Sequence, residues 1–481
     1  MRKPFSSLTL IFIFLALVQV TSAQQKWDLR RCVDYAVTNN ISVKQADVQA
    51  RIAELTFKQS KAGRWPSLSF SNSEGFQFGR SIDPATNLFT NQQIGFTQFQ
   101  MGSNVSLFNW FSRKYAIEAN ELESKASTAN IDKLKNDISL NVAAAYLQAL
   151  LARERVRIVQ VQVGTTAEQL KNTRKLVDAG TLPELNAAEL EAQLATDSSS
   201  LIDAVTNYEA AILQMKLQMN MDPAAPFELD TPPVEQIPVE PFSDLMPDFV
   251  YGLAIKNQPQ QKVNQLRMQS LQKFVKSAKA QMYPTLSAFA QITSSYSSAL
   301  KNLPHGSNIP VIVPIGFTGT GTASNPNVFD QVMIPSGYQK ATFLRQLDYQ
   351  FRQNVGLSVS IPIFNGLQAK TNYERSKLNL HNQELAIDRD NFQLKQDIYS
   401  AYNNALAAHQ RFVASQKTVK TAEYSYQLAK KRYEAGLLRS IDLITNQNNL
   451  YRARIQMVLN QFDYVFRMKV LEFYKGQGLK L

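Results

Sequence analysis

Histidine and cysteine are the side chains from which a metal site or a nucleophilic active site is usually built, and this chain has few of them. Its histidines, His305, His381 and His409, lie too far apart in the sequence for a close set of metal ligands. No glycine-rich phosphate loop follows a predicted strand, and no serine or cysteine stands in a recognisable nucleophile motif. We therefore expect a protein that is not an enzyme, with no catalytic residue, no metal and no cofactor.

The composition indicates a folded chain, with 44% hydrophobic and 19% charged residues. The formal charge is +12, but the basic residues are spread along predicted helices and do not form one patch with interleaved aromatic residues. We therefore expect no nucleic-acid partner. The single cysteine, Cys32, cannot form an internal disulfide and is expected to be a small buried hydrophobe.

The sequence is internally duplicated. Residues of the first half recur at an offset of 218 up to Pro284, and later ones recur at an offset of 256, so 38 residues are inserted between Pro284 and Phe364. Two long copies favour a quasi-symmetric architecture over a solenoid of short repeats. We predict one structural repeat at 24–235 and a second at 236–481. The recurring positions of the first half include Ala36, Asn39, Lys58, Lys61, Ala62, Pro66, Leu68, Phe108, Asn109, Ala145, Tyr146, Ala179 and Gly180.

The first residues read as an export signal. Arg2 and Lys3 precede an apolar run at 8–20, and small residues end at Ala23. We predict a signal peptide at 1–23, and hence a mature protein outside the cytoplasm. After Ala23 no run of about 18 apolar residues remains, so a role in a membrane would have to be carried by strands.

Long helices are predicted where proline is missing, at 113–177 and 368–434, each a rod of roughly 95 Å. The second rod carries two apolar rows at intervals of seven residues, one from Leu378 to Val413 and one from Leu380 to Ala408. The rows lie about 200° apart around the helix, so the helix is expected to pack on both sides, as in a barrel of helices. The same periodicity is also compatible with the core of a simple helical bundle.

Each rod ends at an Ala-Gly pair, at Gly180 and Gly436, and a new helix follows at once. Glycine is favoured where a left-handed residue closes the last turn, so we predict two long helical hairpins with compact tips. The helix cap by itself explains these glycines, so they are not evidence of a binding site.

Strands are predicted before each rod and after Pro66 and Pro284, where apolar and small polar residues alternate. The clearest run is 355–363. Four such strands per chain fit a membrane barrel, although any half-buried sheet shows the same pattern. The smallest membrane barrels need about eight strands, so three chains with twelve strands are expected. The insertion, at about 294–353, is rich in proline and glycine and predicts an enlarged loop. Its apolar stretch at 309–317 either folds over the barrel mouth, touches a partner or extends a strand.

In its order of elements, the chain resembles the TolC-type outer-membrane efflux family. The resemblance covers essentially all of the mature chain and depends on the duplicated unit of helix, two strands, long helix, short turn and helix, with Phe364-Asn365-Gly366 after a strand and Ala-Gly before each tip. It implies an α+β membrane protein: a homotrimer with a 12-stranded β-barrel in the outer membrane of a Gram-negative bacterium, continued by a long periplasmic α-helical barrel.

The resemblance also implies partners and sites. The hairpin tips would dock onto a periplasmic adaptor protein coupled to an inner-membrane pump. By position the tips are Ala179, Gly180, Thr181, Leu182, Ala435, Gly436, Leu437, Leu438 and Arg439. The pore gate would lie near Asp442, with Thr445 and Asn186 at related positions that are not acidic. A solvated carboxylate at a helix start is the alternative for Asp442.

We therefore expect a passive channel of a tripartite efflux or type I secretion system, carrying small molecules or proteins across the outer membrane. The alternative is a soluble periplasmic helical bundle with a structural or interaction role. Neither the cargo nor the class of pump follows from these residues.

Overall fold

The computed structural model describes residues 26–82, 89–91, 93–230, 237–317 and 327–476. The predicted signal peptide at 1–23 and the predicted repeat boundary at 235/236 lie outside these residues. The chain divides into two compact units. A helical unit contains the residues up to Leu55, Glu121–Ser270 and the residues from Asn379 onward. A strand-bearing unit contains Thr56–Asn120 and Leu271–Leu378.

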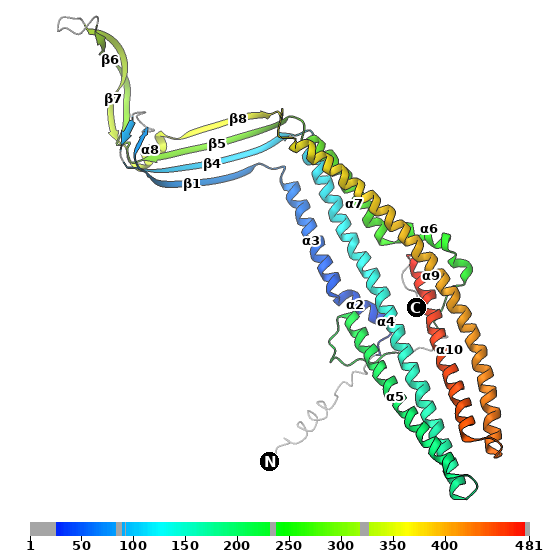
Figure 1. Cartoon of the computed structure of the whole chain (residues 1–481). Coiled ribbons are helices and arrows are strands. Elements are labelled where there is room, and N and C mark those ends of the chain that lie inside the picture. The colour runs from blue at the N-terminus through cyan, green and yellow to red at the C-terminus, as the bar shows by residue number, and fades with distance from the viewer. Residues whose placement is uncertain (1–25, 83–88, 92, 231–236, 318–326, 477–481) are drawn as a thin grey trace, which may run out of the picture. The chain divides into compact units, whose positions relative to one another are not determined.

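The order of the main elements is the same in the two halves of the chain (Figure 1). Each half has two shorter helices, two long strands, a very long helix and a further helix. In the first half these are α2 (Leu29–Asn39), α3 (Ile41–Ala62), β1 (Ser67–Gln77), β4 (Ile94–Phe108), α4 (Ser112–Asp178) and α5 (Glu184–Met219). In the second half they are α6 (Pro247–Asn257), α7 (Pro259–Ala280), β5 (Thr285–Ser297), β8 (Arg352–Ser360), α9 (Gln368–Glu434) and α10 (Ser440–Tyr474).

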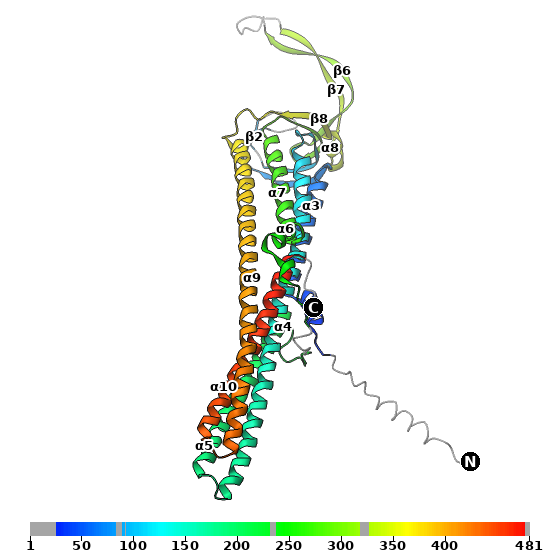
Figure 2. The ribbon, with the colours of Figure 1, turned by 90° about the vertical axis from the view of Figure 1, so that its right-hand side faces the viewer.

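The two predicted rods are confirmed. Both α4 and α9 have 67 residues and run without interruption, because neither contains a proline. Within the helical unit, α4 and α5 form one hairpin and α9 and α10 the other, and the four helices lie side by side (Figure 2). Among the described residues, none of the helices combines the length and apolar character needed to cross a membrane.

The two apolar rows of α9 have different surroundings in the single chain. The row that contains Leu394 and Ala401 packs against a buried cluster formed with Ile398, Ala405 and Met468. The other row is exposed along its length, and Phe392 keeps 76% of its surface. One predicted packing seam is therefore filled within the chain, and the other is exposed to solvent in the single chain.

The main core of the helical unit surrounds Cys32 and Tyr146. Cys32 has no exposed surface, as predicted, and Tyr146 donates its hydroxyl to the carbonyl of Asp230 at 2.9 Å. Burial, assisted by the nearby Asp28 carboxylate, raises the pKa of the Cys32 thiol to about 12. The thiol is therefore protonated and inert at neutral pH.

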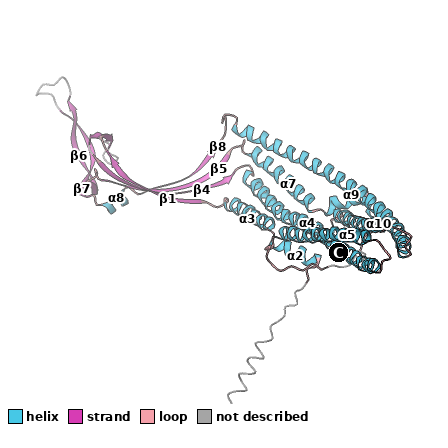
Figure 3. Ribbon diagram, turned by 60° about the horizontal axis from the view of Figure 1, so that its bottom comes forward, coloured by secondary structure: helices cyan, strands magenta, loops and turns pink. Residues whose placement is uncertain are grey.

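The strand-bearing unit contains a four-stranded antiparallel sheet in the order β1-β4-β5-β8, drawn in magenta in Figure 3. The register places the predicted apolar residues on one face. For example, Met101 of β4 lies opposite Phe70 of β1 and Ile292 of β5, and Ala288 of β5 lies opposite Leu357 of β8. The other face carries mainly serine, glutamine, asparagine and glycine. The predicted alternation is therefore confirmed, and β1 and β8 are the two outer strands.

The predicted enlarged loop is corrected by the structure. Residues 302–340 contain two antiparallel strands, β6 (Asn302–Phe317) and β7 (Asn327–Lys340), so the strand alternative for 309–317 is the one observed. Proline is compatible with such a two-stranded ribbon, because its missing N–H can face away from the partner strand. A short helix, α8 (Phe343–Tyr349), follows the ribbon, and a small hairpin of β2 (Arg80–Ile82) and β3 (Phe89–Asn91) lies in the first half.

Helix α8 is fixed to β5 by one buried glutamine. The amide nitrogen of Gln346 donates to the carbonyl of Leu300 at 2.8 Å, and its amide oxygen accepts from the backbone N–H of Ser297 at 2.9 Å. Gln346 is almost completely buried, so these bonds replace its contacts with water.

Candidate functional site

The two predicted tips have the same backbone geometry. Gly180 and Gly436 take φ values of +76° and +72°, in the left-handed region that favours glycine. At the first tip the N–H of Gly180 donates to Val177 at 2.8 Å, and that of Thr181 donates to Leu176 at 2.9 Å. The second tip repeats this pair of bonds. Both rods therefore end in the two-bond glycine cap that satisfies the last carbonyls of a helix.

The tips expose both apolar and charged side chains. Leu437 keeps 70% of its surface, and the Arg439 side chain keeps 81%. The Thr181 hydroxyl donates back to the carbonyl of Leu176 at 2.7 Å, so it stiffens the first tip. Such a surface offers apolar contact and hydrogen bonds to a partner, but no acid–base pair for catalysis.

The gate candidates lie in the first two turns of the helices that follow the tips, α5 and α10. The carboxylate of Asp442 accepts from Nε of Arg439 at 3.2 Å, and it is only partly exposed. The Thr445 hydroxyl donates to the carbonyl of Ile441 at 2.8 Å. The side-chain oxygen of Asn186 accepts from the Ser440 hydroxyl at 3.3 Å. The charge of Asp442 is therefore partly balanced within the chain.

Contacts between the two hairpins were missed by the sequence analysis. Ser440, at the start of α10, is buried and donates its hydroxyl to the carboxylate of Glu189 on α5 as well as to Asn186. Arg174 of α4 forms an ion pair with Glu191 of α5. The Ser440 contact joins the two hairpins close to their tips. The ion pair of Arg174 joins α4 and α5, the two helices of the first hairpin.

A buried polar layer lies deeper in the helical unit. Asp197 of α5 is 5% exposed and accepts from the hydroxyl of Thr166 at 2.6 Å and from the amide nitrogen of Gln193 at 2.7 Å. A longer contact, of 3.4 Å, comes from the amide nitrogen of Gln162. The Thr166 hydroxyl in turn accepts from Gln447 of α10 at 3.0 Å. We call these five residues the Asp197 layer, and it connects α4 and α5 to α10.

Two further bonds connect α4 directly to α9. The amide nitrogen of Gln169 donates to the Tyr426 hydroxyl at 2.7 Å, and the hydroxyls of Thr173 and Tyr433 lie 3.0 Å apart. Burial raises the pKa of the Tyr426 phenol. Together with the Asp197 layer, these bonds hold the two hairpins in one packing arrangement through polar contacts.

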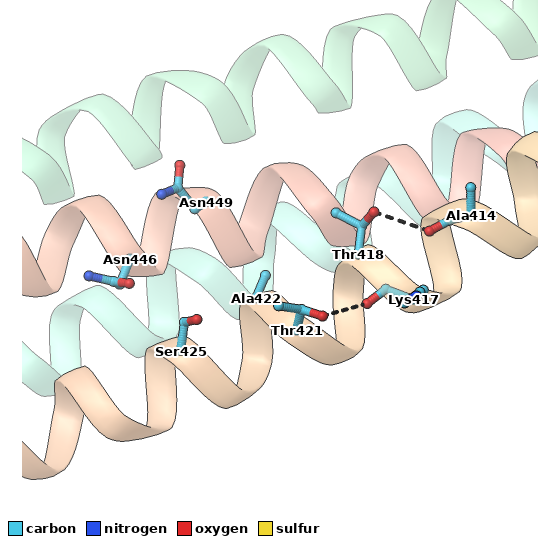
Figure 4. A pocket seen from close by; sticks show the side chains of 8 residues that line it. All are labelled: Ala414, Lys417, Thr418, Thr421, Ala422, Ser425, Asn446 and Asn449. Atoms are coloured by element: carbon cyan, nitrogen blue, oxygen red, sulfur yellow. Dashed lines mark hydrogen bonds between the residues drawn. The ribbon is translucent and has the colours of Figure 1, made fainter.

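A groove of about 540 Å³ runs between α9 and α10 near the second tip (Figure 4). The hydroxyls of Thr418 and Thr421 donate back to carbonyls of their own helix, so the groove presents mostly methyl groups and amides. Asn446, on the opposite wall, donates to the carbonyl of Asp442 at 2.8 Å. Small side chains of this kind allow another helix to approach closely. The lining residues are Ala414, Lys417, Thr418, Thr421, Ala422, Ser425, Asn446 and Asn449.

Two of the histidines serve as a surface residue and a packing residue. His381 lies 3.2 Å from the carboxylate of Glu384, and His409 packs against the rings of Phe242 and Tyr464. In the part of the chain that the structure describes, no three histidine, cysteine or acidic side chains are grouped so that they could hold a metal ion.

Comparison with known proteins gives one consistent result. A family model described as "Outer membrane efflux protein" matches residues 33–219 and 336–471. The alkaline protease secretion protein AprF of Pseudomonas aeruginosa is 20% identical over 430 residues, covering 89% of this chain and 77% of that protein. The outer membrane efflux protein BepC of Brucella suis is 20% identical over 435 residues, covering 89% and 81%. The solved structure of the outer membrane protein VceC of Vibrio cholerae aligns with a TM-score of 0.72 and 14% identity, covering 94% of this chain and 97% of that one.

Proposed function

Because this chain belongs to the outer membrane efflux protein family, we propose that it is the exit duct of a tripartite efflux or type I secretion system. It is an outer-membrane channel of a Gram-negative bacterium that extends into the periplasm. Members of the family are channels and not enzymes, so the energy for export comes from a partner.

The sheet is the observation that carries the detailed proposal. One face is mainly apolar and the other is mainly small and polar. Among the described residues, the outer strands β1 and β8 each have one edge that no other strand pairs with. An open edge cannot face lipid, because unpaired backbone groups there cost several kcal/mol each. Pairing of β8 in one copy with β1 in the next removes both edges. Three copies then form a 12-stranded barrel with lipid outside and water inside.

The exposed row of α9 supports the same assembly in the helical unit. Leu385, Phe392 and Val413 are each more than half exposed, although they recur at the heptad spacing of a packed helix. A neighbouring copy would cover them and continue the packing into an α-helical barrel. The homotrimer therefore accounts for apolar surface in both units.

The hairpin tips are the proposed contact with a periplasmic adaptor, and through it with an inner-membrane pump. Their exposed apolar and basic side chains, Leu437 and Arg439, are suited to such a contact. The name of AprF refers to protein secretion and that of BepC to efflux, so both kinds of cargo are consistent with the relatives.

The assembly is tested by extraction and electrical recording. We expect the native protein to leave the membrane only with detergent, to migrate as a trimer that heat dissociates, and to form conducting pores in planar lipid bilayers. A monomer that is soluble without detergent would contradict the proposal and favour the helical-bundle alternative.

Asp442 is expected to shape ion selectivity at the periplasmic end. Three copies would place three such carboxylates around one opening, and rings of acidic side chains favour cations. Asp442→Ala should therefore lower the cation-to-anion permeability ratio, by about twofold or more. The matched control is Asp203→Ala, at an exposed position of α5 away from the tip. Unchanged conductance and selectivity in Asp442→Ala would remove this residue from the gate.

A further inference from the structure

Six exposed lysines occupy equivalent positions in the two halves of the strand-bearing unit. Lys58, Lys61 and Lys114 of the first half correspond to Lys276, Lys279 and Lys370 of the second. All six lie on the ends of α3, α4, α7 and α9 that adjoin the sheet (Figure 1). The basic residues that look dispersed in the sequence are therefore gathered by the fold at one end of the sheet. We call these six residues the basic collar.

Aromatic side chains accompany the collar. Each lysine pair is followed, four residues later, by an aromatic residue and a proline, Trp65-Pro66 in the first half and Tyr283-Pro284 in the second. Trp65 is 77% exposed, and the ring of Tyr283 lies 5.1 Å from that of Trp110. Trp and Tyr are enriched where a protein crosses from lipid to water, since their rings are apolar and their polar atoms stay hydrated.

The local electrostatics favour an anion. The helix ends at 54–66, 109–120, 271–284 and 364–378 contain only three acidic residues, Glu54, Glu118 and Glu374. Glu54, one turn before Lys58, is itself engaged in an interaction. Glu118 is already engaged, because Lys273 donates to it at 2.6 Å and Lys114 lies 4.0 Å away. The hydrogen bond from Lys273 holds the pKa of the Glu118 carboxyl below its usual range.

The spacing within each lysine pair suits a phosphate group. Lys58 and Lys61, like Lys276 and Lys279, are three residues apart, so the two ammonium groups of each pair lie on one face of their helix. No acidic residue lies between either pair and the proline that follows. An anionic group that sits between the two ammonium groups would be attracted by both of them. The adjacent aromatic ring would meanwhile lie beside the apolar part of the same ligand.

We propose that the basic collar binds the headgroups of anionic phospholipids at the periplasmic surface of the outer membrane. The proposal rests on the proposed function, since it requires this end of the sheet to lie at that surface. A phospholipid would account for the basic and the apolar part of this surface together. Its phosphate would contact the lysine pair, and its acyl chains would contact the apolar face of the sheet. In a trimer the collar would form a ring of repeated lipid sites around the channel.

Tryptophan fluorescence tests the proposal directly. The chain has three tryptophans, and in a Trp27→Phe background the remaining two, Trp65 and Trp110, both lie beside the collar. The trimer is reconstituted in phosphatidylcholine vesicles that contain one-tenth brominated phosphatidylglycerol or, separately, one-tenth brominated phosphatidylcholine. Each lysine favours an anionic lipid about fivefold, so a lysine pair should prefer it about thirtyfold over phosphatidylcholine. At one-tenth of the lipid, we therefore expect the anionic quencher to be enriched about eightfold at the collar.

A fourfold variant and a matched control separate the collar from general charge. Replacing Lys58, Lys61, Lys276 and Lys279 by glutamine should reduce the enrichment to about twofold or less. The same change at exposed lysines of the helical unit, Lys44, Lys171, Lys256 and Lys420, should leave it unchanged. High salt should weaken the preference of the unmodified collar, because it screens exposed charges.

The other outcomes overturn the inference in distinguishable ways. Equal quenching by both lipids would show that the collar lies at the membrane but does not select anionic headgroups. Loss of the preference on adding inorganic phosphate at constant ionic strength would assign the lysines to a soluble ion. No quenching by either lipid would contradict the membrane position itself, and with it the proposed function.

Discussion

Replacing Leu357 by arginine is expected to prevent the protein from assembling in a lipid bilayer. Leu357 lies in β8 on the apolar face of the sheet, opposite Ala288, and is 68% exposed in the single chain. In the proposed barrel this side chain points into lipid, where an arginine near the midplane costs about 2–4 kcal/mol. Because each of the three copies carries the substitution, the total cost is comparable to the whole free energy of unfolding of a typical folded protein.

The neighbouring residue provides the control. Ser358 follows Leu357 in the same strand, lies opposite Ser287, and belongs to the small polar face. Ser358→Arg introduces the same side chain only one residue away, but into the proposed water-filled interior. We expect it to fold with nearly normal yield.

Both variants are compared by refolding into phosphatidylcholine vesicles from urea, with the heat-dissociable trimer as the readout. Leu357→Phe serves as an apolar substitution that should be tolerated. Similar yields for Leu357→Arg and Ser358→Arg would contradict the assignment of the two faces. Folding of the unmodified chain in buffer without detergent or lipid would contradict the membrane barrel altogether.

The long elements could be predicted from the sequence because their signals are local. The absence of proline and the apolar residues at intervals of seven predict the long helices α4 and α9. The glycine caps predict where these helices end, at Gly180 and Gly436. The strands followed from alternation, since a period of two fixes which face each side chain occupies. The trimer, the docking tips and the gate remain predictions from the resemblance and the proposed assembly.

The β6–β7 ribbon was predicted as a loop because composition does not show which way a backbone N–H points. Pro310 lies opposite Met333 and Pro335 lies opposite Asn308. In an isolated pair of strands, every second N–H faces outward, where proline loses no hydrogen bond. The proline content therefore excluded a central strand but not this ribbon.

The Asp197 layer was missed for a different reason. Asp197 precedes three serines, a run that reads as an exposed helix surface. Asp197 is buried because Thr166 of α4 and Gln447 of α10 pack around it. These residues are distant in the sequence, so the sequence of α5 alone does not reveal the contact. The basic collar was also hidden, since it exists only where four helix ends meet one end of a sheet.

Asp197→Ala is expected to loosen the packing of the two hairpins. The substitution removes the acceptor of the buried Thr166 hydroxyl and of the half-buried Gln193 amide. A buried donor that loses its partner costs about 1–3 kcal/mol, so we expect the free energy of unfolding to fall by about 2–4 kcal/mol. Asp197→Asn keeps the shape and one acceptor oxygen, and it should cost about half as much.

Because the Asp197 layer joins α4 and α5 to α10, we also predict which helices the substitution loosens. In Asp197→Ala, amide hydrogen exchange should accelerate in both hairpins, on α5 around position 197 and on α10 around Gln447. Asp203→Ala, at an exposed position of the same helix, is the control and should change stability by less than about 0.5 kcal/mol.

If faster exchange were confined to α5, Asp197 would stabilise only its own hairpin. Acceleration in both hairpins would mean that a single buried carboxylate couples them. A channel that opens by repacking these helices would then have to break or rearrange the bonds of Asp197, since packed elements move between discrete arrangements and do not deform continuously. Asp197→Ala is therefore expected to lengthen the open periods of single channels, and an unchanged open time despite lower stability would place the layer outside the moving part.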